Sequence, residues 1–168
     1  MRFVTYNIQF GVGRDGRLGL ERIAKTVGSA DVIALQEVTR AWPSPDDGDQ
    51  PRQLAEMLDG FQWVYAPSVD VSHPSTPTDA TTRGARQQFG NMLLSRTPIL
   101  ASRAHALPRL ETLDIPRVAL EVVIDTPASG LLRLYSVHLA YKEVEERAAQ
   151  VRAIVDLHRT AWGSKSHI

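Results

Sequence analysis

Three polar side chains of different chemistry, Asn7, Glu37 and His138, each stand at the end of an apolar, strand-like stretch. A carboxylate oxygen is the kind of ligand that a hard divalent cation prefers. An amide can orient a phosphate or a metal-bound water, and an imidazole can hydrogen-bond or protonate a phosphoryl oxygen. Together the three side-chain types favour chemistry on a phosphate ester, provided that the fold brings them into one cleft.

Side-chain alternation along three predicted strands places these residues at the carboxyl ends of mostly apolar faces. The three faces are Phe3, Thr5 and Asn7; Ile33, Leu35 and Glu37; and Leu132, Leu134, Ser136 and His138. A carboxylate that ends a buried strand costs several kcal/mol unless it is paired or bound to a metal. The residues alone leave two interpretations open: convergence on one cleft, or three side chains that each cap a strand in a loop.

The remaining segments predict an α/β protein with a mixed sheet or two sheets. Helices are expected at Leu20–Val27, Gln53–Leu58 and Glu143–Trp162. Strands are expected at Phe3–Ile8, Asp31–Val38, Phe61–Ala66, Phe89–Ser95, Ile99–Leu107, Arg117–Asp125 and Leu131–Leu139. Long loops are expected at Ala41–Arg52 and Pro67–Gln88. The apolar side of the last helix is formed by Val144, Ala148, Val151, Val155 and Trp162, and we expect it to face the core.

Composition excludes several classes of protein. The 168 residues are 43% hydrophobic and 23% charged, as in a globular protein rather than a disordered chain or a coiled coil. Nineteen basic and nineteen acidic residues cancel, which excludes a strongly basic nucleic-acid coat but not a local cationic patch. Cysteine is absent, so disulfides, thiol nucleophiles and zinc ribbons are excluded. No signal peptide or membrane span is recognisable, and a cytoplasmic location is therefore expected.

Four short motifs follow one another along the chain. They are Thr5–Gly11 (TYNIQFG), Asp31–Val38 (DVIALQEV), Phe89–Arg96 (FGNMLLSR) and Ser136–Leu139 (SVHL). In order and spacing they resemble motifs of the endonuclease/exonuclease/phosphatase superfamily, including its GN-x-x-LS and HL strands. The resemblance runs from Arg2 to the helix that ends near Trp162. It implies a four-layer α/β/β/α sandwich of the deoxyribonuclease-like type.

The resemblance also implies a divalent-metal phosphoesterase that hydrolyses a phosphodiester or phosphomonoester by in-line attack of water. Glu37 would bind Mg²⁺ or Mn²⁺, Asn7 would hold the phosphate or help the metal, and His138 would contact the scissile phosphate. Asn91 is a candidate for shaping the cleft or for a structural role, and Arg117 for clamping a phosphate or for an ordinary ion pair. The substrate stays open among nucleic acids, phospholipid headgroups and small phosphodiesters, and zero net charge argues mildly against a processive nuclease.

The chain departs from the family pattern after the HL strand. The GDFN and SDH motifs, which in the family supply further ligands and the base that activates water, do not occur. We therefore expect an incomplete domain over residues 1–162, a separate tail over residues 163–168, and little or no activity of this chain alone. The alternative is an inactive fragment that acts as a scaffold or partner-binding module, with exposed sheet edges that favour self-association.

Overall fold

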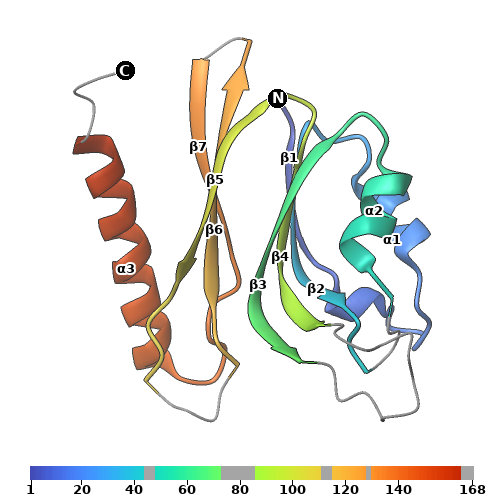
Figure 1. The fold of residues 1–168 in the computed structure, drawn as a ribbon, viewed down its shortest axis with the longest axis horizontal. Helices are drawn as coiled ribbons and strands as arrows, with labels where there is room; N and C mark the ends of the chain where they lie inside the picture. The colour runs from blue at the N-terminus through green and yellow to red at the C-terminus, as the bar shows by residue number, and fades with distance from the viewer. Residues whose placement is uncertain (44–47, 73–85, 111–114, 128–129, 164–168) are drawn as a thin grey trace.

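The described part of the chain folds into four layers (Figure 1). The computed structural model describes residues 1–43, 48–72, 86–110, 115–127 and 130–163. Two helices cover one sheet, a second sheet packs against the other face of the first, and a long helix covers the outside of the second. The predicted α/β/β/α sandwich is confirmed.

The first sheet has four strands in the order β1-β2-β4-β3. They are β1 (Phe3–Asn7), β2 (Val32–Arg40), β3 (Gln62–Ser72) and β4 (Arg86–Ser95). Strands β1 and β2 run parallel, whereas β4 runs antiparallel to both β2 and β3. The parallel pair brings the carboxyl end of β1 alongside β2, which places Asn7 beside the Gln36–Glu37 segment.

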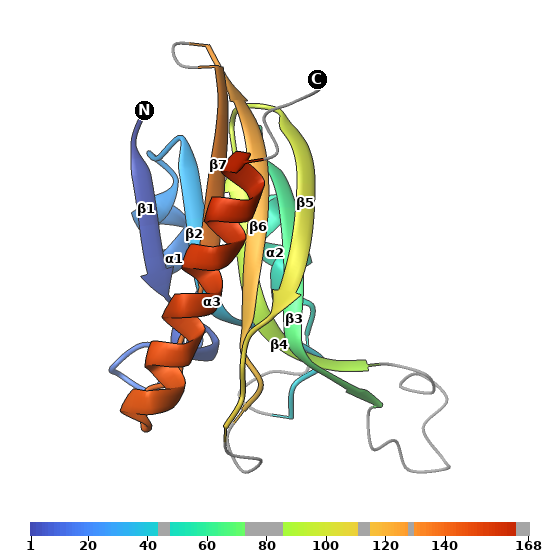
Figure 2. The ribbon, with the colours of Figure 1, turned by 90° about the vertical axis from the view of Figure 1, so that its left-hand side faces the viewer.

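The second sheet is an antiparallel meander in the order β5-β6-β7. Its strands are β5 (Ile99–Ala106), β6 (Val118–Thr126) and β7 (Gly130–Val137). Helix α3 (Val144–Gly163) follows β7 and runs obliquely over the outer face of this sheet (Figure 2). The end of β1 and the connection from β7 to α3 lie at the same, lower end of the sandwich in Figure 1.

Two hydrophobic cores hold the layers together. The outer core lies between the first sheet and the helices α1 (Leu20–Val27) and α2 (Gln50–Met57). It is built from alternate residues of β2 and β4, including Ile33, Leu35 and Leu94. The core between the two sheets is lined by the opposite faces of the same strands and by β6. Its buried members are Val32, Ala66, Leu93, Val118, Leu120, Val122 and Ile124.

Helix α1 has the predicted bounds, whereas α2 begins three residues before the predicted start at Gln53. The Asp49 side chain accepts a hydrogen bond from the backbone N–H of Arg52, which satisfies a donor in the first turn. Pro51 lies in that turn, where a missing N–H carries no penalty. Pro51, which lies within the predicted loop Ala41–Arg52, is therefore part of a helix start.

The prediction of one continuous loop over Pro67–Gln88 was wrong at both ends. Strand β3 continues to Ser72 and pairs with β4 as far back as Arg86. Arg86 donates a 2.5 Å hydrogen bond to the Asp70 carboxylate, and this contact holds the pKa of Asp70 below its usual value. A register shift after Pro67 accommodates the proline within the paired strands. Residues 73–85, the rest of the predicted loop, lie outside the described residues.

The prediction for the buried face of α3 was also wrong. Val144 is 67% exposed, and Val151 and Val155 face solvent as well, while Glu146 and Gln150 are buried. The side chain of Trp162 lies outside the described residues, as does nearly all of the predicted tail.

Buried Gln150 and Glu146 fasten α3 to the loops before β6 and after β7. The Gln150 amide accepts from the backbone of Ala140 at 2.8 Å and donates to the carbonyl of Pro108 at 3.1 Å. The Glu146 carboxylate accepts from the Leu110 backbone at 3.2 Å. These bonds give the loop groups hydrogen-bond partners, which accounts for the two polar side chains on the inward face of α3.

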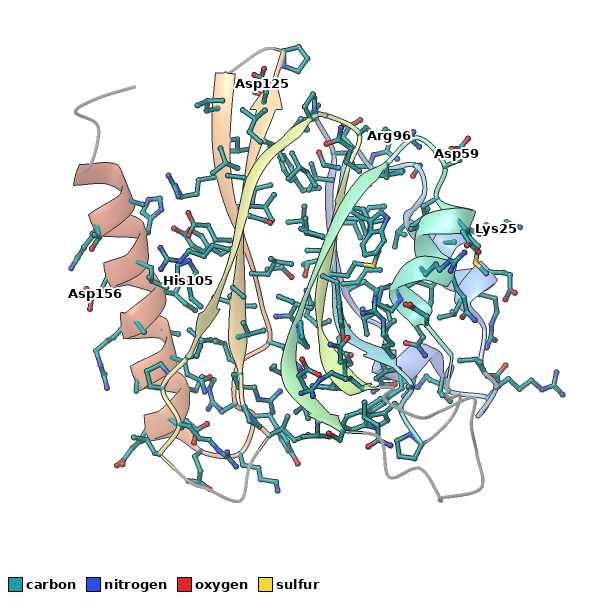
Figure 3. All side chains as sticks on the ribbon, viewed as in Figure 1. Lys25, Asp59, Arg96, His105, Asp125 and Asp156 are labelled. Carbon is teal, nitrogen blue, oxygen red and sulfur yellow. The ribbon has the colours of Figure 1, made fainter. Side chains whose placement is uncertain are left out.

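A charged cluster lies beneath α3 on the outer face of the second sheet. His105 projects between β5 and α3 (Figure 3), and its ring nitrogen Nε2 lies 2.5 Å from the Glu121 carboxylate. Arg133 of β7 forms an ion pair with the other oxygen of that carboxylate. The cluster lies on the outer side of the second sheet, whereas Asn7 and Glu37 belong to the first sheet.

None of the helices in the described ranges combines the length and the hydrophobicity that a membrane span requires.

Candidate active site

A pocket of about 350 Å³ lies at the end of the sandwich where β1, β2, β6 and β7 meet. One part of its wall is polar and consists of Asn7, Glu37, Arg117 and His138. The other part is apolar and aromatic and consists of Phe10, Phe89, Ile115 and Tyr141. Four of the five residues proposed from the sequence as site residues therefore line one pocket.

Glu37 reaches this pocket because of a β-bulge in β2. The pairing with β4 shifts register between Gln36 and Val38, and Glu37 adopts a left-handed backbone with φ of 60°. Alternation predicted that Glu37 would share a face with Ile33 and Leu35. That prediction was wrong, because the bulge breaks the alternation and Val38 takes the place in the outer core.

Side chains on both sides of Glu37 hold the bulge in place. The Gln36 amide donates to the Ser136 hydroxyl of the second sheet at 3.3 Å. The Tyr65 hydroxyl donates to the Val38 carbonyl at 3.0 Å, and burial raises the pKa of this phenol well above its usual value. A left-handed conformation costs a non-glycine residue about 1–2 kcal/mol. This strain is maintained by the neighbours and aims the carboxylate at the pocket.

Asn7, the last residue of β1, orients the Glu37 carboxylate. Its amide Nδ2 donates to Glu37 Oε1 at 2.9 Å, and its Oδ1 accepts from the backbone N–H of Gln9 at 2.9 Å. The second bond determines which way the amide points. Asn7 therefore presents its N–H side to the carboxylate.

His138, directly after β7, lies between an anion and a cation. Its Nε2 is 3.6 Å from Glu37 Oε1, and its Nδ1 is 3.0 Å from a guanidinium nitrogen of Arg117. Both Glu37 and His138 keep about a fifth of their side-chain surface exposed, 17% and 22% respectively. Small molecules from solvent can therefore reach the groups, although protein surrounds most of each side chain.

Asn91 does not line the pocket. It is 2% exposed, and its amide donates to the carbonyls of Val118 at 3.0 Å and Ser136 at 3.3 Å. Val118 follows Arg117 in the chain, and Ser136 lies two residues before His138. The arrangement favours the role of shaping the cleft: Asn91 ties the first sheet to the backbone that carries two pocket residues.

Gln50 is a supporting residue that sequence reasoning missed. It is completely buried at the start of α2. Its Oε1 accepts from the Thr39 backbone at 3.1 Å, and its Nε2 donates to the Phe10 carbonyl at 2.7 Å. Phe10 has a left-handed backbone with φ of 57°, and its ring lies 5.5 Å from that of Phe89. Gln50 therefore joins β2 to the strained segment that forms the aromatic wall.

We expect Gln50→Leu to lower the free energy of unfolding by about 2 kcal/mol, because one buried and one partly buried backbone group lose their partners. Urea denaturation followed by circular dichroism measures the change. Gln53→Leu, on the same helix at a partly exposed position, is the control and should change stability by less than about 0.5 kcal/mol. Equal effects of the two substitutions would show that the Gln50 bonds contribute nothing specific.

The fold and the pocket are accompanied by a sequence match over nearly the whole chain. The model of the Endonuclease/Exonuclease/phosphatase family matches residues 4–168, and the chain belongs to this family. No curated protein matches it.

Solved structures share the fold. An endonuclease/exonuclease/phosphatase from Beutenbergia cavernae has 30% identity and a TM-score of 0.72 over 92% of this chain and 43% of its own. A family protein from Leptotrichia buccalis has 16% identity and a TM-score of 0.65, over 93% of this chain and 62% of its own. The 3′ phosphatase NExo from Neisseria, bound to a product DNA hairpin, has 15% identity and a TM-score of 0.51. The match covers 98% of this chain and 53% of the phosphatase. The chain thus spans about half the length of these proteins.

Proposed function

We propose that this chain forms the phosphate-binding part of a divalent-metal-dependent phosphoesterase. Membership of a family of phosphoester hydrolases supports the reaction class. The observation that carries the proposal is the single pocket in which Glu37, Asn7 and His138 meet, with Arg117 behind the imidazole. A carboxylate, an amide, an imidazole and a guanidinium in contact with one another are the groups needed to bind a phosphate together with a cation.

Each side chain has a role in this proposal. The imidazole Nε2 of His138 faces the pocket and donates a hydrogen bond to a phosphoryl oxygen as negative charge develops there. The Arg117 guanidinium adds positive charge next to that imidazole. Asn7 holds the Glu37 carboxylate in one orientation, so that a bound phosphate and a cation meet a preformed site.

The residues fit a weakly held Mg²⁺ or Mn²⁺ at Glu37. Among the described residues, no group of three or more His, Cys, Asp or Glu side chains is arranged to hold a metal ion. Mg²⁺ is commonly held by one or two carboxylates together with water and substrate phosphates. Glu37 is the residue that would hold the cation, and the hydrogen bond from Asn7 to Oε1 leaves further lone pairs of the carboxylate for that role. When bound, the ion would supply charge stabilisation to the phosphate.

We expect this chain without substrate to bind Mg²⁺ with a dissociation constant of about 1 mM or weaker, since one carboxylate replaces few of the waters around the ion. Isothermal titration calorimetry measures the constant, with Glu37→Gln as the comparison. Binding in the low micromolar range at one site would contradict the expectation and indicate a further acidic ligand.

We also propose that the base which activates the water lies in a longer form of the protein. Glu37 is the single carboxylate that lines the pocket within the described residues, and the cation would occupy it. General-base assistance is worth about 10²–10⁴-fold in rate. We therefore expect the 168-residue chain to be a weak hydrolase at best. Comparing it with a longer form on one substrate in Mn²⁺ tests this, and equal rates would contradict it.

The substrate in this proposal is a phosphate ester, and DNA is the first to test. A structural neighbour is named as a 3′ phosphatase bound to a product DNA hairpin. The test panel is plasmid DNA, a 3′-phosphorylated hairpin, RNA, sphingomyelin and bis-p-nitrophenyl phosphate, each with Mg²⁺ and with chelator. Hydrolysis that is lost on chelation supports the proposal. No hydrolysis of any member by a longer form would contradict it.

The alternative function is a scaffold or partner-binding module without catalysis. In the described part of the chain the outer strands are β1 and β3 in one sheet and β5 and β7 in the other. Such edges can add a strand from another molecule. A mass that rises with concentration in light scattering, together with no hydrolysis on the panel, would favour this function and self-association through the edges.

A further inference from the structure

Arg117 contacts His138 in a way that determines the protonated nitrogen of the imidazole. Arg117 is 5% exposed, so its side chain is enclosed by protein. Its backbone is held as well, because the Arg117 carbonyl accepts a hydrogen bond from the Leu107 N–H at 3.0 Å. Its NH1 lies 3.0 Å from His138 Nδ1. A guanidinium can only donate, and Nδ1 must therefore be the acceptor.

A neutral imidazole with an accepting Nδ1 carries its proton on Nε2. In this pocket Nε2 lies 3.6 Å from Glu37 Oε1 and faces the polar wall that includes Asn7. Rotating the ring by 180° would turn a carbon toward the guanidinium and lose the 3.0 Å bond. The contact with Arg117 thus selects both the tautomer and the ring orientation.

We infer that Arg117 is a positioning residue, which holds His138 as the Nε2–H tautomer so that Nε2 donates into the phosphate pocket. This differs from a direct phosphate clamp, the role considered for Arg117 from the sequence. The statement about the tautomer stands on the contact geometry, and its consequence for hydrolysis rests on the function proposed above. The two parts can fail separately.

The tautomer is measured directly by long-range ¹H–¹⁵N correlation spectra of the 168-residue chain at a pH where the imidazole is neutral. Loss of one ring system in His138→Asn assigns the signal. We expect a pyridine-type Nδ1 and a protonated Nε2 in the unmodified chain and in the matched control Arg86→Met. Arg117→Met should give a mixture of tautomers, whereas Arg117→Lys, which keeps a donor, should retain Nε2–H at least in part.

Two results would overturn the inference. One is a protonated Nδ1 in the unmodified chain, which needs no variant and so holds even if Arg117→Met fails to fold. The other is an unchanged His138 spectrum in a folded Arg117→Met.

In a longer, active form we expect Arg117→Met to lower kcat about 10–100-fold, since a misplaced group costs of this order. KM should change less than about 3-fold if Arg117 acts through His138. A large rise in KM with little change in kcat would instead identify a direct phosphate contact and overturn the positioning role. If no form is active, the proposed function fails, and the spectra still decide the tautomer.

Discussion

Replacing Glu37 by Gln is expected to lower the turnover of a longer, active form of this protein by about 10²–10³-fold, the loss of a few kcal/mol of charge stabilisation. Glutamine keeps the shape of the side chain, and its carbonyl oxygen can still accept from Asn7 Nδ2. What disappears is the negative charge that holds the cation. Initial rates at saturating substrate, measured over a range of Mn²⁺ concentrations, give the effect.

The matched control for this substitution is Glu56→Gln. Glu56 is an exposed carboxylate of α2 whose partner is Arg52 on the same helix, and surface pairs of this kind contribute little. We expect unchanged turnover for Glu56→Gln and unchanged thermal stability for both variants. Normal turnover of Glu37→Gln at every Mn²⁺ concentration would show that the carboxylate is not needed, whereas recovery only at high Mn²⁺ would show that its role is to bind the cation.

Replacing Gly90 by Val is expected to cost at least about 3 kcal/mol of folding free energy, at the upper end of the range for overpacking. A Cβ at this position would lie 2.1 Å from the Ala66 carbonyl oxygen and 2.6 Å from the Pro67 Cα. Both are backbone atoms of the paired strand β3, so no side-chain rotation relieves the contact. Neighbouring Phe89 and Asn91 would move with the strand. The pocket would then lose the Phe89 ring from its wall and the hydrogen bonds by which Asn91 joins the two sheets.

Chemical denaturation of the 168-residue chain measures this cost, and Gly16→Ala is the control. Gly16 has φ of 73°, but a Cβ added there would meet no atom of a non-adjacent residue within 4 Å. Only the backbone strain of about 1–2 kcal/mol therefore applies to the control. A larger loss of stability in Gly90→Val than in Gly16→Ala would indicate a steric cost, because Gly90 has no left-handed backbone strain of its own. If Gly90→Val were no less stable than Gly16→Ala, the close approach of β3 would not be the reason for glycine in the FGN motif.

The order of elements and the membership of the site could be read from the sequence. Apolar runs and alternation depend on neighbours within a few residues, and they predicted the strands and the helix Leu20–Val27. The four layers were implied by the resemblance of the motifs to a known family. The same motifs brought Asn7, Glu37 and His138 forward as one site, and the three side chains lie in one pocket. Local pattern sufficed to select these residues because Asn7 ends β1, Glu37 lies near the end of β2 and His138 directly follows β7.

The directions in which side chains point were decided by tertiary contacts. Glu37 faces the pocket because the bulge is stabilised by Gln36, Val38 and their partners on other elements, which alternation within β2 cannot reveal. Gln50 acts on Phe10, forty residues away in the chain.

Helix α3 illustrates the same limit. Its valines lie on an exposed side, whereas Glu146 and Gln150 face inward and form hydrogen bonds with loop backbone groups. Hydrophobic periodicity measures the gain from burying side chains and contains no information on which distant backbone groups would be left unpaired. The sequence by itself therefore determined the elements and the residues of the site, and the packing of distant segments decided their orientation, because buried polar groups must be satisfied.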